Sequence, residues 1–92
     1  MAKKVLFVLT SHDQLVSGKP TGFWLSEVSH PYYVFKDSNY EITMVTPKGG
    51  KSPMDAKSKD DDPENLKFLA DEEAQKQINN TLTPDQVLDA AV

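Results

Sequence analysis

Apolar residues form two short runs in the first half of the chain, and both have the length of a β-strand. Residues 5–9 are continuously apolar and rich in β-branched and aromatic side chains, a pattern typical of a strand buried on both faces of a parallel sheet. Residues 40–45 follow a second pattern, in which Ile42 and Met44 share one face of the strand. The chain between the two runs is long enough for the helical crossover that parallel strands require.

A polar loop over residues 10–21 leads into a segment with the apolar spacing of a helix. Large apolar residues recur there three or four positions apart, as on one helix face. They are Trp24, Leu25, Val28, Tyr32 and Phe35. Pro31 interrupts this pattern and predicts a kink or the first turn of a second helix. Because Tyr32 and Tyr33 are adjacent, we expect only one of them to face the core. Strand, helix and strand together predict a right-handed βαβ unit.

The second half of the chain predicts a long loop and helices. Residues 47–50 (PKGG) end the second strand, and a loop then runs to about Asn65. Residues 66–79 predict one surface helix, and Thr83 with Pro84 predicts the N-cap and first turn of a short final helix. Two parallel strands do not make a stable open sheet. We therefore expect the chain to be part of a larger α/β domain or to pair with another chain.

The composition excludes several classes of protein. The 92 residues contain 10 Lys, no Arg and 14 acidic residues, which gives a net charge of −4 and argues against nucleic-acid binding. The absence of Cys excludes a disulfide scaffold and a thiol nucleophile within this chain. The apolar run near the N-terminus is too short for a secretory signal, and no run reaches the roughly 20 residues of a membrane span. The expected compartment is the cytoplasm, without membrane binding.

Several segments match, in order and spacing, the pattern of one known family. They are residues 21–27 (TGFWLSE), His30, Pro31, Phe35, residues 40–50 (YEITMVTPKGG), Pro53, Asp55, Ser58 and residues 82–87 (LTPDQV). On these residues the chain resembles the ThiJ/PfpI superfamily, which has the class I glutamine amidotransferase-like fold, and within it the glyoxalase III and heat-shock chaperone branch. The resemblance implies a flavodoxin-like three-layer α/β sandwich with a parallel sheet, of which residues 1–92 form an incomplete, N-terminal part.

The resemblance also implies an active site. Family members carry a nucleophilic cysteine on a strand-to-helix elbow, paired with a buried glutamate from the first helix region, and the matching residue here is Glu27. The elbow and its cysteine would lie beyond the end of this chain. We expect Glu27 to be catalytic and largely buried at the carboxyl edge of the sheet. We assign Gly22 and Trp24 to substrate binding, with Gly22 allowing close backbone approach beside Glu27.

The activity implied by the resemblance is conversion of methylglyoxal, a small aldehyde, to lactate, or related deglycase or hydrolase chemistry, without cofactor or metal. Because the chain has no Cys, we expect it to be inactive alone. The complete protein is expected to be a homodimer. One alternative is a stress-related holdase chaperone of the same branch, which needs no catalysis. Another is a flavodoxin-like interaction module that folds alone.

Other candidate groups are interpreted as structural. His12 and His30 have no second ligand at a helix-face spacing, and we expect extended geometry for His30 because it precedes Pro31. Gly49 and Gly50 predict a turn instead of a phosphate-binding loop. The acidic run at residues 60–62 predicts a solvated loop instead of a calcium site. The aromatic residues of the predicted helix are more consistent with core packing than with a client-binding surface.

Overall fold

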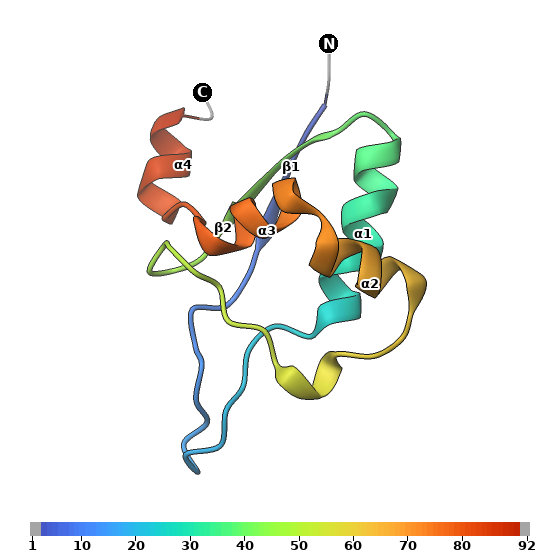
Figure 1. Cartoon of the computed structure of the whole chain (residues 1–92). Helices are drawn as coiled ribbons and strands as arrows, with labels where there is room; N and C mark the ends of the chain where they lie inside the picture. The colour runs from blue at the N-terminus through green and yellow to red at the C-terminus, as the bar shows by residue number, and fades with distance from the viewer. Residues whose placement is uncertain (1–2, 91–92) are drawn as a thin grey trace.

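The computed structural model describes residues 3–90, which form a parallel β-sheet and surrounding helices (Figure 1). The elements in chain order are β1 (Lys4–Val8), α1 (Leu25–Asp37), β2 (Glu41–Val45), the 3₁₀ turn η1 (Ala56–Ser58), α2 (Pro63–Ala70), α3 (Glu72–Asn79) and α4 (Pro84–Ala90). The strands pair in parallel, with Lys4 opposite Glu41 and Val8 opposite Val45. The predicted βαβ unit and α/β fold class are therefore confirmed.

The sheet has one covered face and one face that is largely uncovered. Val5 and Phe7 of β1 pack against the hydrophobic core, to which α1, α2 and α3 all contribute. Leu6 and Val8 point to the other face and are 45% and 71% exposed. The prediction that the first strand is buried on both faces is wrong for this chain, because its three core helices all pack against the same face.

Helix α1 is one continuous helix that passes through Pro31. The proline has no N–H to donate to the carbonyl of Glu27 four residues earlier, but it does not end the helix. Tyr32 and Tyr33 are both buried, so the prediction that only one of them faces the core is wrong. The reason is that α2 packs along a second side of α1, where the ring of Phe68 meets both tyrosine rings edge-on.

The single helix predicted over residues 66–79 is two helices, α2 and α3, which meet at Asp71. The backbone of Asp71 is extended, and its carboxylate accepts a hydrogen bond from the N–H of Ala74 at 3.1 Å, which caps α3. The hydroxyl of Tyr33 donates to the same carboxylate at 3.0 Å. The predicted start of α4 is confirmed, because Thr83 and Gln86 exchange the two hydrogen bonds of a capping box.

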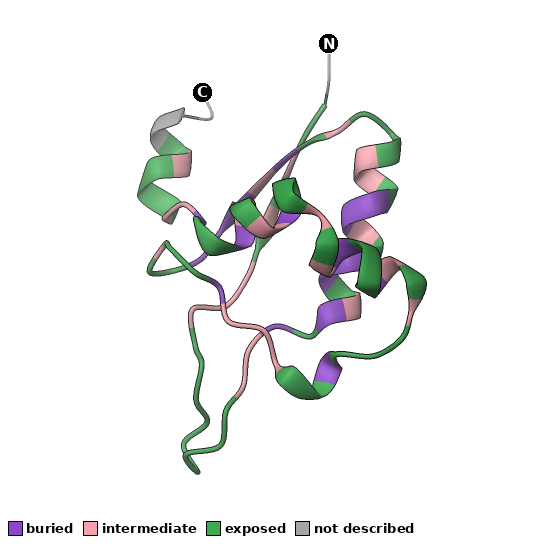
Figure 2. Cartoon of the chain, in the orientation of Figure 1, coloured by how far each residue is buried: buried purple, intermediate pink, exposed green. Residues whose placement is uncertain are grey.

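A buried polar contact joins α1 to α2 beneath the aromatic cluster. The hydroxyl of Ser29 donates to the side-chain oxygen of Asn65, and both residues are fully buried. The amide of Asn65 donates in turn to Asp60 at 2.8 Å, so the groups satisfy one another. In contrast, residues 12–20 form an exposed projecting loop (Figure 2). Within residues 3–90, no helix has both the length and the apolar character that a membrane crossing requires.

Candidate functional site

The segments that follow the two strands meet at the carboxyl edge of the sheet. The hydroxyl of Ser52 donates to the carbonyl of Thr10 at 2.8 Å, and the N–H of Lys48 donates to the hydroxyl of Ser11 at 3.0 Å. Because β1 and β2 are parallel, the connecting helix α1 begins near the carboxyl ends of the strands and runs antiparallel to them (Figure 1). Ligands of open α/β sheets bind outside the carboxyl ends of the strands, so this edge is the candidate site.

Gly22 lies where the entrance to α1 packs closely against the backbone of Pro53. The N–H of Phe23 donates to the carbonyl of Pro53 at 2.8 Å, and the N–H of Asp55 donates to the carbonyl of Phe23 at 2.9 Å. A Cβ on Gly22 would lie 2.4 Å from the Pro53 carbonyl oxygen. The predicted close backbone approach is confirmed, but its neighbour is the Pro53 backbone and not Glu27. The assignment of Gly22 to substrate binding stays a prediction.

Trp24 occupies the N-cap position immediately before α1. It was expected on the apolar face of the helix, but it lies outside the core and is 46% exposed. A residue at the N-cap precedes the helical turns, so the helical spacing does not determine the direction of its side chain. The exposed indole at this edge is available to a ligand, and its substrate-binding role stays a prediction.

Glu27 lies in the first turn of α1, at the predicted edge of the sheet, but it is exposed. The prediction that it is largely buried is therefore wrong for this chain. Among residues 3–90, none pairs with its carboxylate or donates a hydrogen bond to it, and a carboxylate without such a partner is most stable in water. The positive end of the helix dipole favours a negative charge at this position.

His30 is helical, and its side chain contacts the start of α2. Its Nε2 lies 2.9 Å from a carboxylate oxygen of Asp62, and this hydrogen bond raises the pKa of His30 and lowers that of Asp62. The extended geometry expected before Pro31 is wrong, because the buried neighbours Val28 and Tyr32 keep this turn in the helix. The side chains of His30 and Asp62 are partly exposed, so this contact links α1 to the start of α2 at the protein surface.

The remaining candidate groups have structural roles. The acidic run at residues 60–62 forms a loop in which Asp60 and Asp61 are exposed, as predicted. Asp62 also caps α2, because its carboxylate accepts a hydrogen bond from the N–H of Asn65 at 3.1 Å. Gly49 and Gly50 both have a φ of 70°, which confirms the predicted turn. His12 is exposed. Across the part of the chain that the structure describes, no three His, Cys, Asp or Glu side chains are grouped to hold a metal ion.

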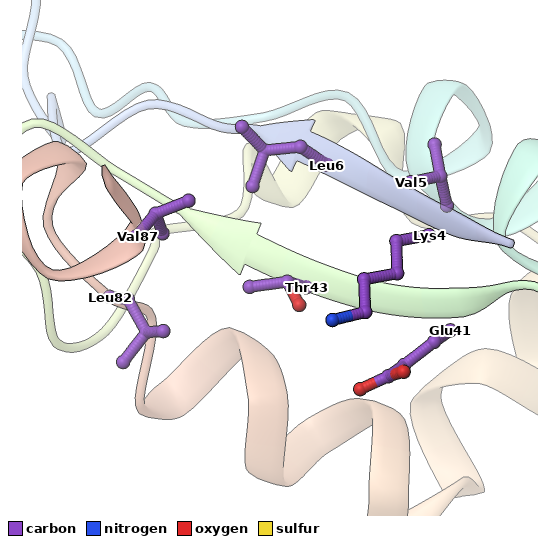
Figure 3. A pocket seen from close by; sticks show the side chains of 7 residues that line it. All are labelled: Lys4, Val5, Leu6, Glu41, Thr43, Leu82 and Val87. Carbon is purple, nitrogen blue, oxygen red and sulfur yellow. The ribbon is translucent and has the colours of Figure 1, made fainter. Parts of the chain in front are cut away.

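Sequence reasoning did not find a cleft on the uncovered face of the sheet (Figure 3). Its volume is about 290 Å³. Its lining residues are Lys4, Val5, Leu6, Glu41, Thr43, Leu82 and Val87. The continuous apolar run at residues 5–9 carried the signal, since such a run predicts apolar side chains on both faces of the strand. The cleft lies on the face of β1 where Leu6 and Val8 are exposed.

Comparison with known proteins gives relatives of known structure. No protein-family model matches the chain. The chain is similar to the Francisella tularensis Rapid Encystment Protein of 24 kDa, with 43% identity and a TM-score of 0.79 over 88% of this chain and 37% of that one. It is also similar to the crystal structure of glyoxalase III from Candida albicans, with 28% identity and a TM-score of 0.67 over 86% and 36% of the two chains.

A curated protein matches over a shorter stretch. Glyoxalase 3 of Candida albicans is 40% identical over 48 residues, which are 50% of this chain and 20% of that protein. The chain thus spans a fifth of the curated relative and little more than a third of the solved structures that it matches. The likeness confirms the predicted fold, an incomplete flavodoxin-like α/β sandwich with a parallel sheet.

Proposed function

Because the chain belongs to the ThiJ/PfpI superfamily, we propose that it supplies the glutamate of a glyoxalase III-type active site. The observation that carries the proposal is the position of Glu27. It stands in the first turn of α1, at the carboxyl edge of a parallel sheet similar to that of glyoxalase III from Candida albicans. The cysteine nucleophile would come from a segment outside this chain, which has none.

The proposed reaction needs one thiolate, one carboxylate and water. The cysteine sulfur adds to the aldehyde carbon of methylglyoxal and forms a hemithioacetal. Glu27 removes the proton from that carbon and returns a proton to the neighbouring carbon, which converts the adduct to a thioester of lactate. Water then hydrolyses the thioester, releasing lactate and the thiol. The reaction adds one water to methylglyoxal overall and requires no external oxidant or reductant.

The exposure of Glu27 imposes a condition on this mechanism. A carboxylate surrounded by water is a weak base towards a C–H bond, and removal of water strengthens it. The segment that brings the cysteine must therefore also cover the first turn of α1. In this chain the carboxylate is exposed, so the proposal applies to the completed site and not to the 92 residues alone.

The experiment measures lactate formation from methylglyoxal. The 92-residue chain is expected to show no turnover, because it contains no Cys. The chain is then substituted for the matched segment of Candida albicans glyoxalase III, and the chimera is assayed with and without Glu27→Gln. We expect kcat/KM to fall by about 10²- to 10⁴-fold, the usual contribution of a general acid–base group.

The matched control is Glu72→Gln, which changes an exposed glutamate in the first turn of α3. It should leave kcat/KM within about twofold, because it lies outside the candidate site. Circular dichroism of each chimera checks that the fold is retained. Equal activity of the Glu27→Gln and unchanged chimeras, or turnover by the 92-residue chain alone, would contradict the proposal.

The holdase alternative predicts a different result with the same variant. Under that alternative, Glu27→Gln leaves the suppression of client aggregation unchanged. The aromatic surface that it requires is small in the described chain, since Tyr32 and Tyr33 are buried and Trp24 is the aromatic residue that is largely exposed. The cytoplasmic location, the homodimer, and the absence of nucleic-acid and membrane partners stay predictions of the sequence.

A further inference from the structure

Pro31 stands in the interior of α1, where proline is the least favourable residue for a helix. The helix continues through it because Val28, Tyr32 and Tyr33 are buried and hold this part of α1 against the core. We propose that Pro31 is a positioning residue for Glu27 and acts by leaving the backbone carbonyl of Glu27 without its helical donor. This role rests on the catalytic role proposed for Glu27.

The backbone carbonyl of Glu27 is the group that Pro31 affects most directly. In an α-helix each carbonyl accepts from the N–H four residues later, so the usual donor to Glu27 would be residue 31. Proline has no N–H, and its ring also presses against the carbonyl four residues earlier. Among residues 3–90, no backbone N–H from outside α1 donates to this carbonyl. The proline therefore removes a hydrogen bond that would join the first turn of α1 to the rest of the helix.

The first turn of α1 has attachments that do not depend on the missing hydrogen bond. The side chains of Leu25 and Val28 are buried in the core. Immediately before the turn, the N–H of Phe23 donates to the carbonyl of Pro53 at 2.8 Å, which joins the entrance of α1 to the loop before η1 (Figure 1). The direction of Glu27 is therefore set by the core and by this loop more than by the later turns of α1.

The proposed reaction depends on the direction of the Glu27 carboxylate. This group takes a proton from one carbon and returns a proton to the next, and a displacement of about 1 Å can lower such a rate by about 10²-fold. An N–H at residue 31 would bond to the Glu27 carbonyl and draw that peptide group towards the helix axis. Because the peptide group and the side chain share one Cα, the carboxylate would move as well. Pro31 prevents this movement.

A purely structural role for Pro31 predicts a different change in stability. If its half-buried ring served only for packing or to restrict the unfolded chain, Pro31→Ala would destabilise the fold. Under our proposal the variant gains a helical hydrogen bond and a better helix former, so it should be at least as stable as the unchanged chain. The two roles therefore predict opposite shifts of the urea midpoint.

The first test uses the full 92-residue chain. Urea denaturation of Pro31→Ala is expected to give a midpoint equal to or higher than that of the unchanged chain, at a constant m value. In the same variant, the new amide at residue 31 should exchange its hydrogen at least about tenfold more slowly than in the unfolded chain, because it bonds to the Glu27 carbonyl. A lower midpoint, or an unprotected amide at residue 31, would overturn the proposal.

The second test measures methylglyoxal turnover by the glyoxalase III chimera. Pro31→Ala is expected to lower kcat by about 10- to 100-fold and to leave KM within about twofold, because the carboxylate is displaced for the proton transfers. Val34→Ala is the matched control, since it changes an exposed residue of α1 and leaves the Glu27 carbonyl without a donor. It should change kcat by less than about twofold. Equal kcat values for Pro31→Ala and the unchanged chimera would refute the positioning role.

A backbone ester separates the missing N–H from the proline ring. Pro31→lactic acid, introduced by cell-free synthesis with a suppressor tRNA, has the methyl group of alanine but an ester oxygen in place of the N–H. We expect it to restore kcat to within about threefold of the unchanged chimera, and an ester variant as slow as Pro31→Ala would overturn the proposal.

Glu27→Gln in the same chimera separates the two proposals. Unchanged kcat/KM in Glu27→Gln would refute the catalytic role of Glu27. A loss of activity in Glu27→Gln without a loss in Pro31→Ala would refute only the positioning role of Pro31.

Discussion

Replacement of Gly22 by Ala tests how strongly the entrance to α1 depends on close backbone approach. The added Cβ would lie 2.4 Å from the Pro53 carbonyl oxygen, whereas ordinary contacts begin at 3.4 Å, so the two segments must separate by about 1.0 Å (3.4 − 2.4). A shift of that size lengthens the 2.8 Å bond between Phe23 and Pro53 to about 3.8 Å, beyond hydrogen-bonding range. The same separation lengthens the adjoining 2.9 Å bond from Asp55 to Phe23 to about 3.9 Å, so this bond is lost as well.

The loss of two backbone hydrogen bonds, at about 1–1.5 kcal/mol each, predicts a decrease of about 2–3 kcal/mol in the free energy of unfolding. Urea denaturation followed by circular dichroism measures it, with the m value checked for constancy. Gly18→Ala is the control, because Gly18 has a φ of 89° and its nearest contact is 4.0 Å away. That variant isolates backbone strain of about 1–2 kcal/mol. A Gly22→Ala variant no less stable than Gly18→Ala would refute the steric argument.

Two further contacts give predictions for the same chain. The hydrogen bond between His30 and Asp62 raises the pKa of His30 above 6.5 and lowers the pKa of Asp62 below 3.8. The stabilisation from this contact is therefore lost as the pH rises through the raised pKa of His30, and also as the pH falls through the lowered pKa of Asp62. As the pH rises from about 5.5 to about 8.5, the Tm of the unchanged chain should therefore fall more than the Tm of the His30→Gln variant. Equal falls would show that the contact between His30 and Asp62 does not stabilise the fold. Tyr33→Phe removes a bond to the Asp71 carboxylate and should cost about 1–2 kcal/mol in urea denaturation. Tyr40→Phe, whose hydroxyl bonds to no described side chain, should cost less than about 0.5 kcal/mol, and equal costs would show that the Asp71 contact contributes little.

The strands and α1 were predictable because their signals are local. The apolar run at residues 5–9 and the three- and four-residue spacing after residue 24 specify a strand and a helix before any tertiary contact forms. The break between α2 and α3 was not predictable in this way. Asp71 is compatible with a helix interior by propensity, and its capping role depends on its own extended backbone and on Tyr33, which is distant in the sequence. The burial of both Tyr32 and Tyr33 likewise depends on α2.

The candidate site likewise combines features set by the local sequence with features set by distant segments. A βαβ connection requires the helix to begin at the carboxyl edge of the strands, so the position of Glu27 followed from the order of the elements. Its burial did not follow, because burial depends on which segment covers the first turn of α1. The close approach at Gly22 was predictable as a property of glycine, while its neighbour Pro53 is set by the pairing of two loops.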